Sequence, residues 1–229
     1  MEESVKFSKI GLGIKLIFIG IILRIFCAAA LLIPYGVIVT LIAIYVEAIL
    51  MLLGLRIAGK REKGYRIAFF VYALIVAYSW AESALEEVLL NDVASFLYTT
   101  GQMLLEVVLA YLICHTTVKL LKEKGEKKLA IQGKVVYIFF MFRTAFTILY
   151  GALSWFFTIP AILEVLIIPL GLCYMVMQVV YIVFLGRSYI FFERKSEELE
   201  INFQLMEEND SPGAEEKSEE PTQDGTITE

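Results

Sequence analysis

The stretch KLIFIGIILR, Lys15 to Arg24, places eight apolar or small residues between two cations. The stretch KVVYIFFMFR, Lys134 to Arg143, has the same spacing. Both lie inside apolar runs of about 20 residues, the length that a helix needs to cross the hydrocarbon core of a bilayer. Nine residues of helix span about 13.5 Å. We therefore predict that Arg24 and Arg143 project near the middle of two transmembrane helices.

The rest of the chain continues this apolar pattern. It has 229 residues, of which 59% are hydrophobic, and a mean hydropathy of +0.72, which is more apolar than a soluble domain of this length. Arg24 interrupts the first run, so we expect a retained helix rather than a cleaved signal peptide. The sequence predicts an all-α polytopic membrane protein with six spans, at residues 13–32, 37–58, 65–85, 92–118, 135–157 and 161–185.

Charge in the loops predicts the orientation. The connections at 60–66, 119–134 and 187–195 are rich in Lys and Arg, whereas those near 33–36, 86–91 and 158–160 contain neither. Basic loops face the cytoplasm in most membrane proteins. We therefore expect a multi-pass protein of the cell membrane, built from three hairpins with short outer turns, with both termini in the cytoplasm.

The C-terminal part differs sharply in composition. From Ser196 onward the chain has twelve acidic residues and one lysine, a charge of −11, whereas the whole chain carries only −5. We expect a six-helix domain over 1–195, then a helical extension over 196–208 that either continues the sixth helix or lies along the interface. Residues 209–229 lack bulky apolar side chains and are expected to be disordered. This tail either keeps the protein soluble or docks onto a basic partner.

Polar side chains recur at similar depths in the even-numbered spans. The segments EAILMLLGLR, EVVLAYLICH and QVVYIVFLGR each place a Glu or Gln nine residues before a residue that is cationic or ionisable. The third span breaks the pattern, because the residue nine positions after Arg66 is Ile75. The alignment indicates either a threefold repeat or a chance match of short apolar strings. The candidate substrate-binding or ion-network residues are Arg24, Glu47, Glu106, Arg143 and Gln178.

Energetics favour pairing among these residues. One unpaired charge at the bilayer centre costs about 2.5–3.5 kcal/mol on insertion scales, and an arginine can bind a carboxylate through two hydrogen bonds. Glu47 is the first candidate partner of Arg24, and Glu106 is the next. Alternatively, Arg24 reaches toward the inner interface, since its side chain is long. A real network would either join helices or form a functional site.

Function is less constrained than fold. The chain contains no HExxH, GxSxG or P-loop motif, so the sequence does not favour an enzyme. With one histidine and three scattered cysteines we expect no metal and no cofactor. We also expect no nucleic-acid partner. The leading prediction is a small-solute transporter or solute-binding membrane subunit, in contact with the lipid bilayer and with a small solute or ion. The alternative is a non-transport membrane protein that stabilises or regulates a protein partner at its cytoplasmic face.

Overall fold

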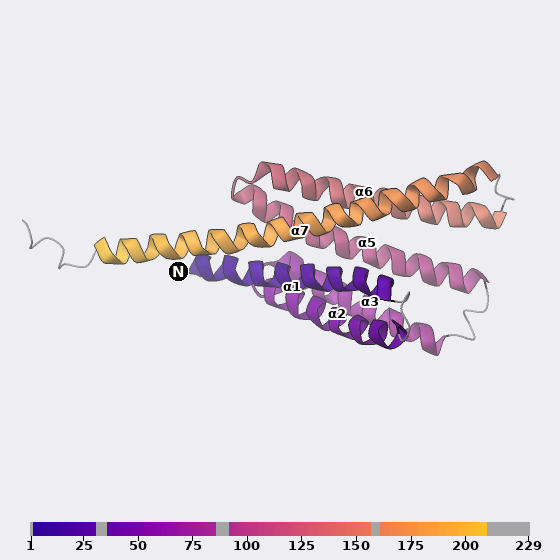
Figure 1. Cartoon of the computed structure of the whole chain (residues 1–229), viewed down its shortest axis with the longest axis horizontal. Helices are drawn as coiled ribbons and strands as arrows, with labels where there is room; N and C mark the ends of the chain where they lie inside the picture. The colour runs from indigo at the N-terminus through magenta and orange to yellow at the C-terminus, as the bar shows by residue number, and fades with distance from the viewer. Residues whose placement is uncertain (1, 31–35, 86–91, 157–160, 210–229) are drawn as a thin grey trace, which may run out of the picture.

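A computed structural model of the chain describes residues 2–30, 36–85, 92–156 and 161–209. Six long helices make up almost all of these residues (Figure 1). They are α1 (Glu2–Ala30), α2 (Gly36–Gly59), α3 (Lys63–Ala84), α5 (Asp92–Glu123), α6 (Lys127–Phe156) and α7 (Ala161–Asn209). The prediction of an all-helical chain is confirmed for the described ranges.

Several helices extend well past the apolar runs that predict them. The first begins at Glu2, eleven residues before the predicted start of its span, and α7 continues without a break to Asn209. The segment 196–208 therefore continues the last helix, which was one of the two predicted alternatives. Charged residues such as Lys, Arg and Glu are good helix formers, so the end of an apolar run does not end a helix. Apart from Asn209, the predicted disordered tail lies outside the described residues.

The connection between α5 and α6 ends the helix by a specific turn. Gly125 has a φ of 84°, which glycine adopts at little cost. Its N–H donates to the carbonyl of Lys122 over 3.1 Å, and the N–H of Glu126 donates to the carbonyl of Leu121 over 2.9 Å. These two hydrogen bonds form a Schellman motif, which satisfies carbonyls that the helix end leaves open.

The helices are arranged as a closed ring. Each helix packs against the helices that precede and follow it in the chain, and α1 also packs against α7. In Figure 1 the N-terminus of α1 lies at the same end of the bundle as the connections α2–α3 and α5–α6. We call this the basic end, because these two connections carry Lys60, Arg61, Lys124 and Lys127. Beyond it, α7 projects past the start of α1.

Much of the outer surface is apolar. Large hydrophobic side chains of α2, such as Val37, Ile42, Tyr45 and Ile49, are more than half exposed. Among the described residues, five helices are long and apolar enough to cross a membrane: α2, α3, α5, α6 and α7. The described part of α1 is not one of them. These features indicate an integral, multi-pass membrane protein.

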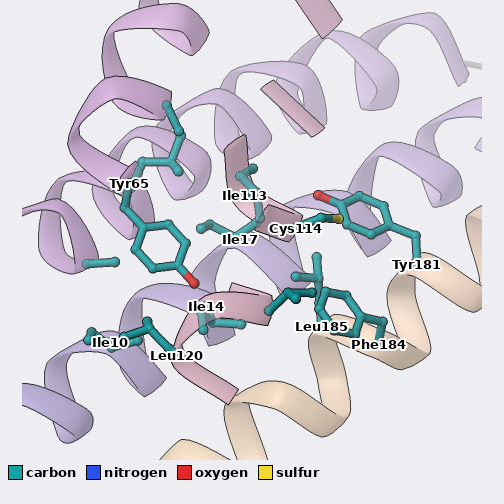
Figure 2. Close-up of a cluster of buried hydrophobic side chains, with 14 of the residues drawn as sticks. Ile10, Ile14, Ile17, Tyr65, Ile113, Cys114, Leu120, Tyr181, Phe184 and Leu185 are labelled. Atoms are coloured by element: carbon teal, nitrogen blue, oxygen red, sulfur yellow. The ribbon is translucent and has the colours of Figure 1, made fainter. Parts of the chain in front are cut away.

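Among the residues whose burial the structure describes, the buried side chains gather in the half of the bundle nearest the basic end, which we call the packed half. Figure 2 shows its centre, where side chains from α1, α3, α5 and α7 meet. The labelled residues there are Ile10, Ile14, Ile17, Tyr65, Ile113, Cys114, Leu120, Tyr181, Phe184 and Leu185. The backbones of α1 and α2 approach closely at Gly13 and Gly54, where a Cβ on Gly54 would lie 2.6 Å from the Gly13 carbonyl oxygen. Small residues at such crossings are typical of membrane helix packing.

Candidate functional site

On α1 and α2, the helix face that is buried in the packed half also carries a charged residue farther along each helix. On α2, Met51, Leu55 and Ala58 are buried, and Glu47 lies one turn before Met51. On α1, the buried residues Ile10, Ile14 and Ile17 lead at helical spacing to Arg24. Residues three or four apart share one face of a helix. The same periodicity that builds the core therefore directs these two charges inward.

Arg24 lies between two carboxylates. Its Nε is 3.0 Å from Oε1 of Glu47 on α2, and one of its terminal nitrogens is 3.9 Å from Oε1 of Glu106 on α5. Tyr72 on α3 donates a longer hydrogen bond, 3.5 Å, to the same Glu47 oxygen. One guanidinium, two carboxylates and one phenol from four helices thus form a connected group, which we call the Arg24 network.

The members of this network differ in burial. The Glu47 side chain is only 5% exposed, whereas those of Arg24 and Glu106 are 54% and 42% exposed. A buried carboxylate needs hydrogen bonds from donors to offset its lost hydration, and Arg24 and Tyr72 supply them to Glu47. Glu106 keeps more open surface, and its one ion pair among the described residues is the longer contact with Arg24. The network therefore has a closed side at Glu47 and an open side at Glu106.

A cavity of about 480 Å³ adjoins the network and is partly open. All six helices contribute to its wall, which is mostly apolar. Its polar and ionisable side chains are Arg24, Glu47, Tyr72, Glu106, Arg143, Thr144, Gln178 and Tyr181. Cavities of a few hundred Å³ that are apolar and contain a few polar groups are typical ligand sites. Ile113 and Tyr181 belong both to this wall and to the core, so the packed half forms the floor of the cavity.

The structure brings together all five residues that the sequence singles out. Arg24, Glu47, Glu106, Arg143 and Gln178 line this one cavity. Arg24 contacts both predicted partners, with the closer contact to Glu47. Arg143 on α6 and Gln178 on α7 lie on the wall formed by those helices and also engage in interactions of their own. Whether these residues bind a solute remains a prediction.

Sequence reasoning misses Tyr72, Thr144 and Tyr181, which also line the cavity. In the third span it considers only the position nine residues after Arg66, which is Ile75. Tyr72 lies three residues before Ile75, on the same helix face, and its hydroxyl reaches Glu47. A search for polar groups within one helical turn of the expected depth would have found it.

The described residues offer little for metal binding. Within the ranges that the structure describes, no three His, Cys, Asp or Glu side chains come together in a way that suits a metal ion. The chemistry available at the cavity is instead ion pairing, hydrogen bonding and apolar contact. Comparison with known proteins gives no further guide, because no family model, no curated protein and no solved structure matches this chain.

Proposed function

We propose that this chain spans the membrane six times as three hairpins, with both termini in the cytoplasm, and that its central cavity binds a small solute for transport or delivery. The observation that carries the proposal is the cavity itself, to which all six helices contribute and in which the charged side chains of the chain's interior converge. Ionisable groups inside a membrane domain are costly, which makes them candidates for function.

The orientation rests on loop charge. The basic connections at 60–66 and 119–134 lie at the basic end, together with the start of α1. With that end in the cytoplasm, α1 crosses the membrane in addition to the five helices named above, which makes six spans. The cavity then lies on the outer side of the packed half. Cysteines replacing Lys60 and Glu126, which are both exposed, are expected to react with an impermeant thiol reagent only after cells are permeabilised. A cysteine at Asn91 is expected to react in intact cells, and protection there would contradict six spans.

Binding in the cavity is tested by filling it. Val179 lines the cavity and is 58% exposed, whereas Val183, one turn further along α7, is exposed but does not line it. A panel of amines, carboxylates and amino acids is screened by melting shift on the purified protein in detergent. Solutes that stabilise the wild type are expected to lose their effect with Val179→Trp and to keep it with Val183→Trp. A shift that survives Val179→Trp would contradict binding in this cavity.

A second candidate function is supported by the far end of α7. Past its contact with α1, the helix carries four exposed apolar side chains, Ile201, Phe203, Leu205 and Met206. Exposed apolar residues next to an acidic tail suit the docking of a protein partner at the cytoplasmic face. Co-purification of a partner that is lost on deleting residues 201–229, with unchanged melting of the membrane domain, would favour this regulatory role over solute binding.

A further inference from the structure

The distribution of charge in the cavity narrows the class of solute. Two carboxylates, Glu47 and Glu106, lie within 4 Å of the single guanidinium of Arg24. One guanidinium matches the charge of one carboxylate, so this side of the cavity carries a local excess of one negative charge. Arg143 balances the total from α6, but the two carboxylates share Arg24. An excess charge at a mostly apolar wall favours a ligand of opposite sign.

The two contacts of Arg24 are unequal, which indicates where a ligand enters. The 3.0 Å contact to buried Glu47 has the length of a charge-assisted hydrogen bond, whereas the 3.9 Å contact to Glu106 is too long for one. Glu106 is also the more exposed carboxylate. A second cation can therefore approach Glu106 while Arg24 keeps its bond to Glu47, so that the buried carboxylate is never left without a partner.

The apolar lining suits the body of such a ligand. Tyr72, Phe140 and Tyr181 line the cavity together with Met51, Met103 and Met175. Aromatic faces attract cations, and methionine adapts to ligands of varied shape. A fully hydrated metal ion would gain nothing from this wall. An organic cation with apolar substituents would use both the lining and the carboxylate.

We propose that the cavity binds an amphipathic organic cation, an ammonium or phosphonium centre carrying apolar groups, with Glu106 as its counter-ion. This inference rests on the proposed solute-binding function and adds the chemical class of the solute. Glu47 holds Arg24 on the closed side of the network, and Tyr72 donates to the same oxygen of Glu47, so that both act as positioning residues. Glu106 determines specificity for charge.

Two ions of the same shape and opposite charge test this class directly. Binding of tetraphenylphosphonium and of tetraphenylborate to the full-length protein in a non-ionic detergent is measured by calorimetry. We expect the phosphonium to bind more tightly than the borate. Glu106→Gln is expected to weaken phosphonium binding about tenfold or more, the effect of losing one charged contact. The matched control Glu193→Gln, an exposed carboxylate 4.0 Å from Lys15 and outside the cavity wall, should leave it unchanged.

A second measurement does not require the Glu106→Gln variant to fold. It asks whether the bound ion protects a cysteine in the cavity from a thiol reagent. Met103 lies one turn before Glu106 and lines the cavity. In a chain whose native cysteines are replaced by alanine, tetraphenylphosphonium should slow the reaction of a thiol reagent with Met103→Cys. It should not slow the reaction with Glu126→Cys in the α5–α6 connection.

The outcomes separate the inference from the proposed function. Equal or tighter binding of the borate, or phosphonium affinity unchanged by Glu106→Gln, would overturn the cationic class and leave a solute cavity standing. If neither ion binds or protects Met103→Cys, the cationic class falls, and the wider solute panel then decides the proposed function. Binding of inorganic cations alone would also overturn the inference, because the apolar lining would then have no role.

Discussion

The two halves of the bundle differ in the kind of polar side chain that they contain and in how it is satisfied. In the packed half, the buried polar side chains that the structure describes are neutral hydroxyls, each bonded within one helix or to one neighbouring helix: Tyr65 bonds Thr117 over 2.7 Å, and Ser4 and Ser196 join α1 to α7. In the cavity half, charges on three helices contact one another, and Arg24 and Glu106 are about half exposed. Hydroxyls can be satisfied within one or two helices, whereas charges need each other. The comparison assigns the larger share of the stability to the packed half, and the proposed binding to the other half.

The largest expected loss of stability comes from a substitution in the packed half, which forms the floor of the cavity. Phe184 is fully buried and Phe142 is 64% exposed. Truncating a buried phenylalanine typically costs about 3–5 kcal/mol, so Phe184→Ala should greatly lower the melting temperature in detergent or prevent folding. Phe142→Ala, the matched control on α6, should change it little. Equal effects of the two substitutions would break the contrast between packed and open regions.

The next effect tests the Arg24 network. Arg24→Leu should destabilise the protein by about 2 kcal/mol, less than the ~3–5 kcal/mol of a fully buried pair because Arg24 is half exposed. The loss arises from leaving Glu47 charged and buried, so Glu47→Gln in the same chain should restore part of it. Lys15→Leu on the same helix, whose contact with Glu193 is exposed, is the control. Strictly additive effects of Arg24→Leu and Glu47→Gln on unfolding would eliminate coupling between them.

A smaller difference in stability is expected between substitutions of two buried tyrosines, Tyr65 and Tyr72. Thr117 donates its proton to the carbonyl of Ile113, so Tyr65 must donate to Thr117, and Tyr65→Phe should cost about 1 kcal/mol. The Tyr72 bond to Glu47 is 0.8 Å longer, at 3.5 Å against 2.7 Å, and Tyr72→Phe should cost less than Tyr65→Phe. Tyr72→Phe should instead weaken solute binding. The reverse order in chemical denaturation would mean that the network, not the floor, is the tighter hydrogen-bonded region.

The smallest effect lies at the surface of the basic end. Lys124 donates a hydrogen bond to Glu3, which lowers the pKa of that carboxyl below its ordinary value of 4.5. A lowered folded pKa means that the contact stabilises the protein above pH 4.5 and is lost as the pH falls through the folded pKa. Glu3→Gln should therefore be slightly less stable than the wild type at pH 7, and the difference should vanish in melts at strongly acidic pH. A difference that persists there would exclude ionisation as its cause.

Much of the fold follows from local sequence. Apolar runs locate the helices, α5 begins at Asp92, where the fourth span is predicted to start, and Gly125 ends α5. The nine-residue spacing from basic loops places Arg24, Glu47, Glu106, Arg143 and Gln178 at one cavity. This works because helical rise is constant, so equal spacing from one boundary gives equal depth.

What the sequence misses depends on contacts between distant helices. Apolar side chains surround α2 on nearly every face, so its periodicity does not tell which side meets α1. The packing of α1 on α7, which closes the ring, joins residues as far apart as Ser4 and Ser196. The sharing of Arg24 between Glu47 and Glu106 and the part played by Tyr72 follow from that closure. The spacing of residues along a single helix does not predict either of these contacts.

Because α7 is one continuous helix, its C-terminal end is joined to the cavity without a break. From Gln178 at the cavity to Met206 the helix runs 28 residues, about 42 Å of continuous hydrogen-bonded backbone. A tilt of roughly 5° about Gln178 would displace Met206 by about 4 Å over that length. Because Ser196 lies between these two residues and is hydrogen-bonded to Ser4 on α1, such a tilt would have to move α1 together with α7 or break these bonds. Distance measurements between labels on Met206 and Lys60, with and without solute, would record that displacement.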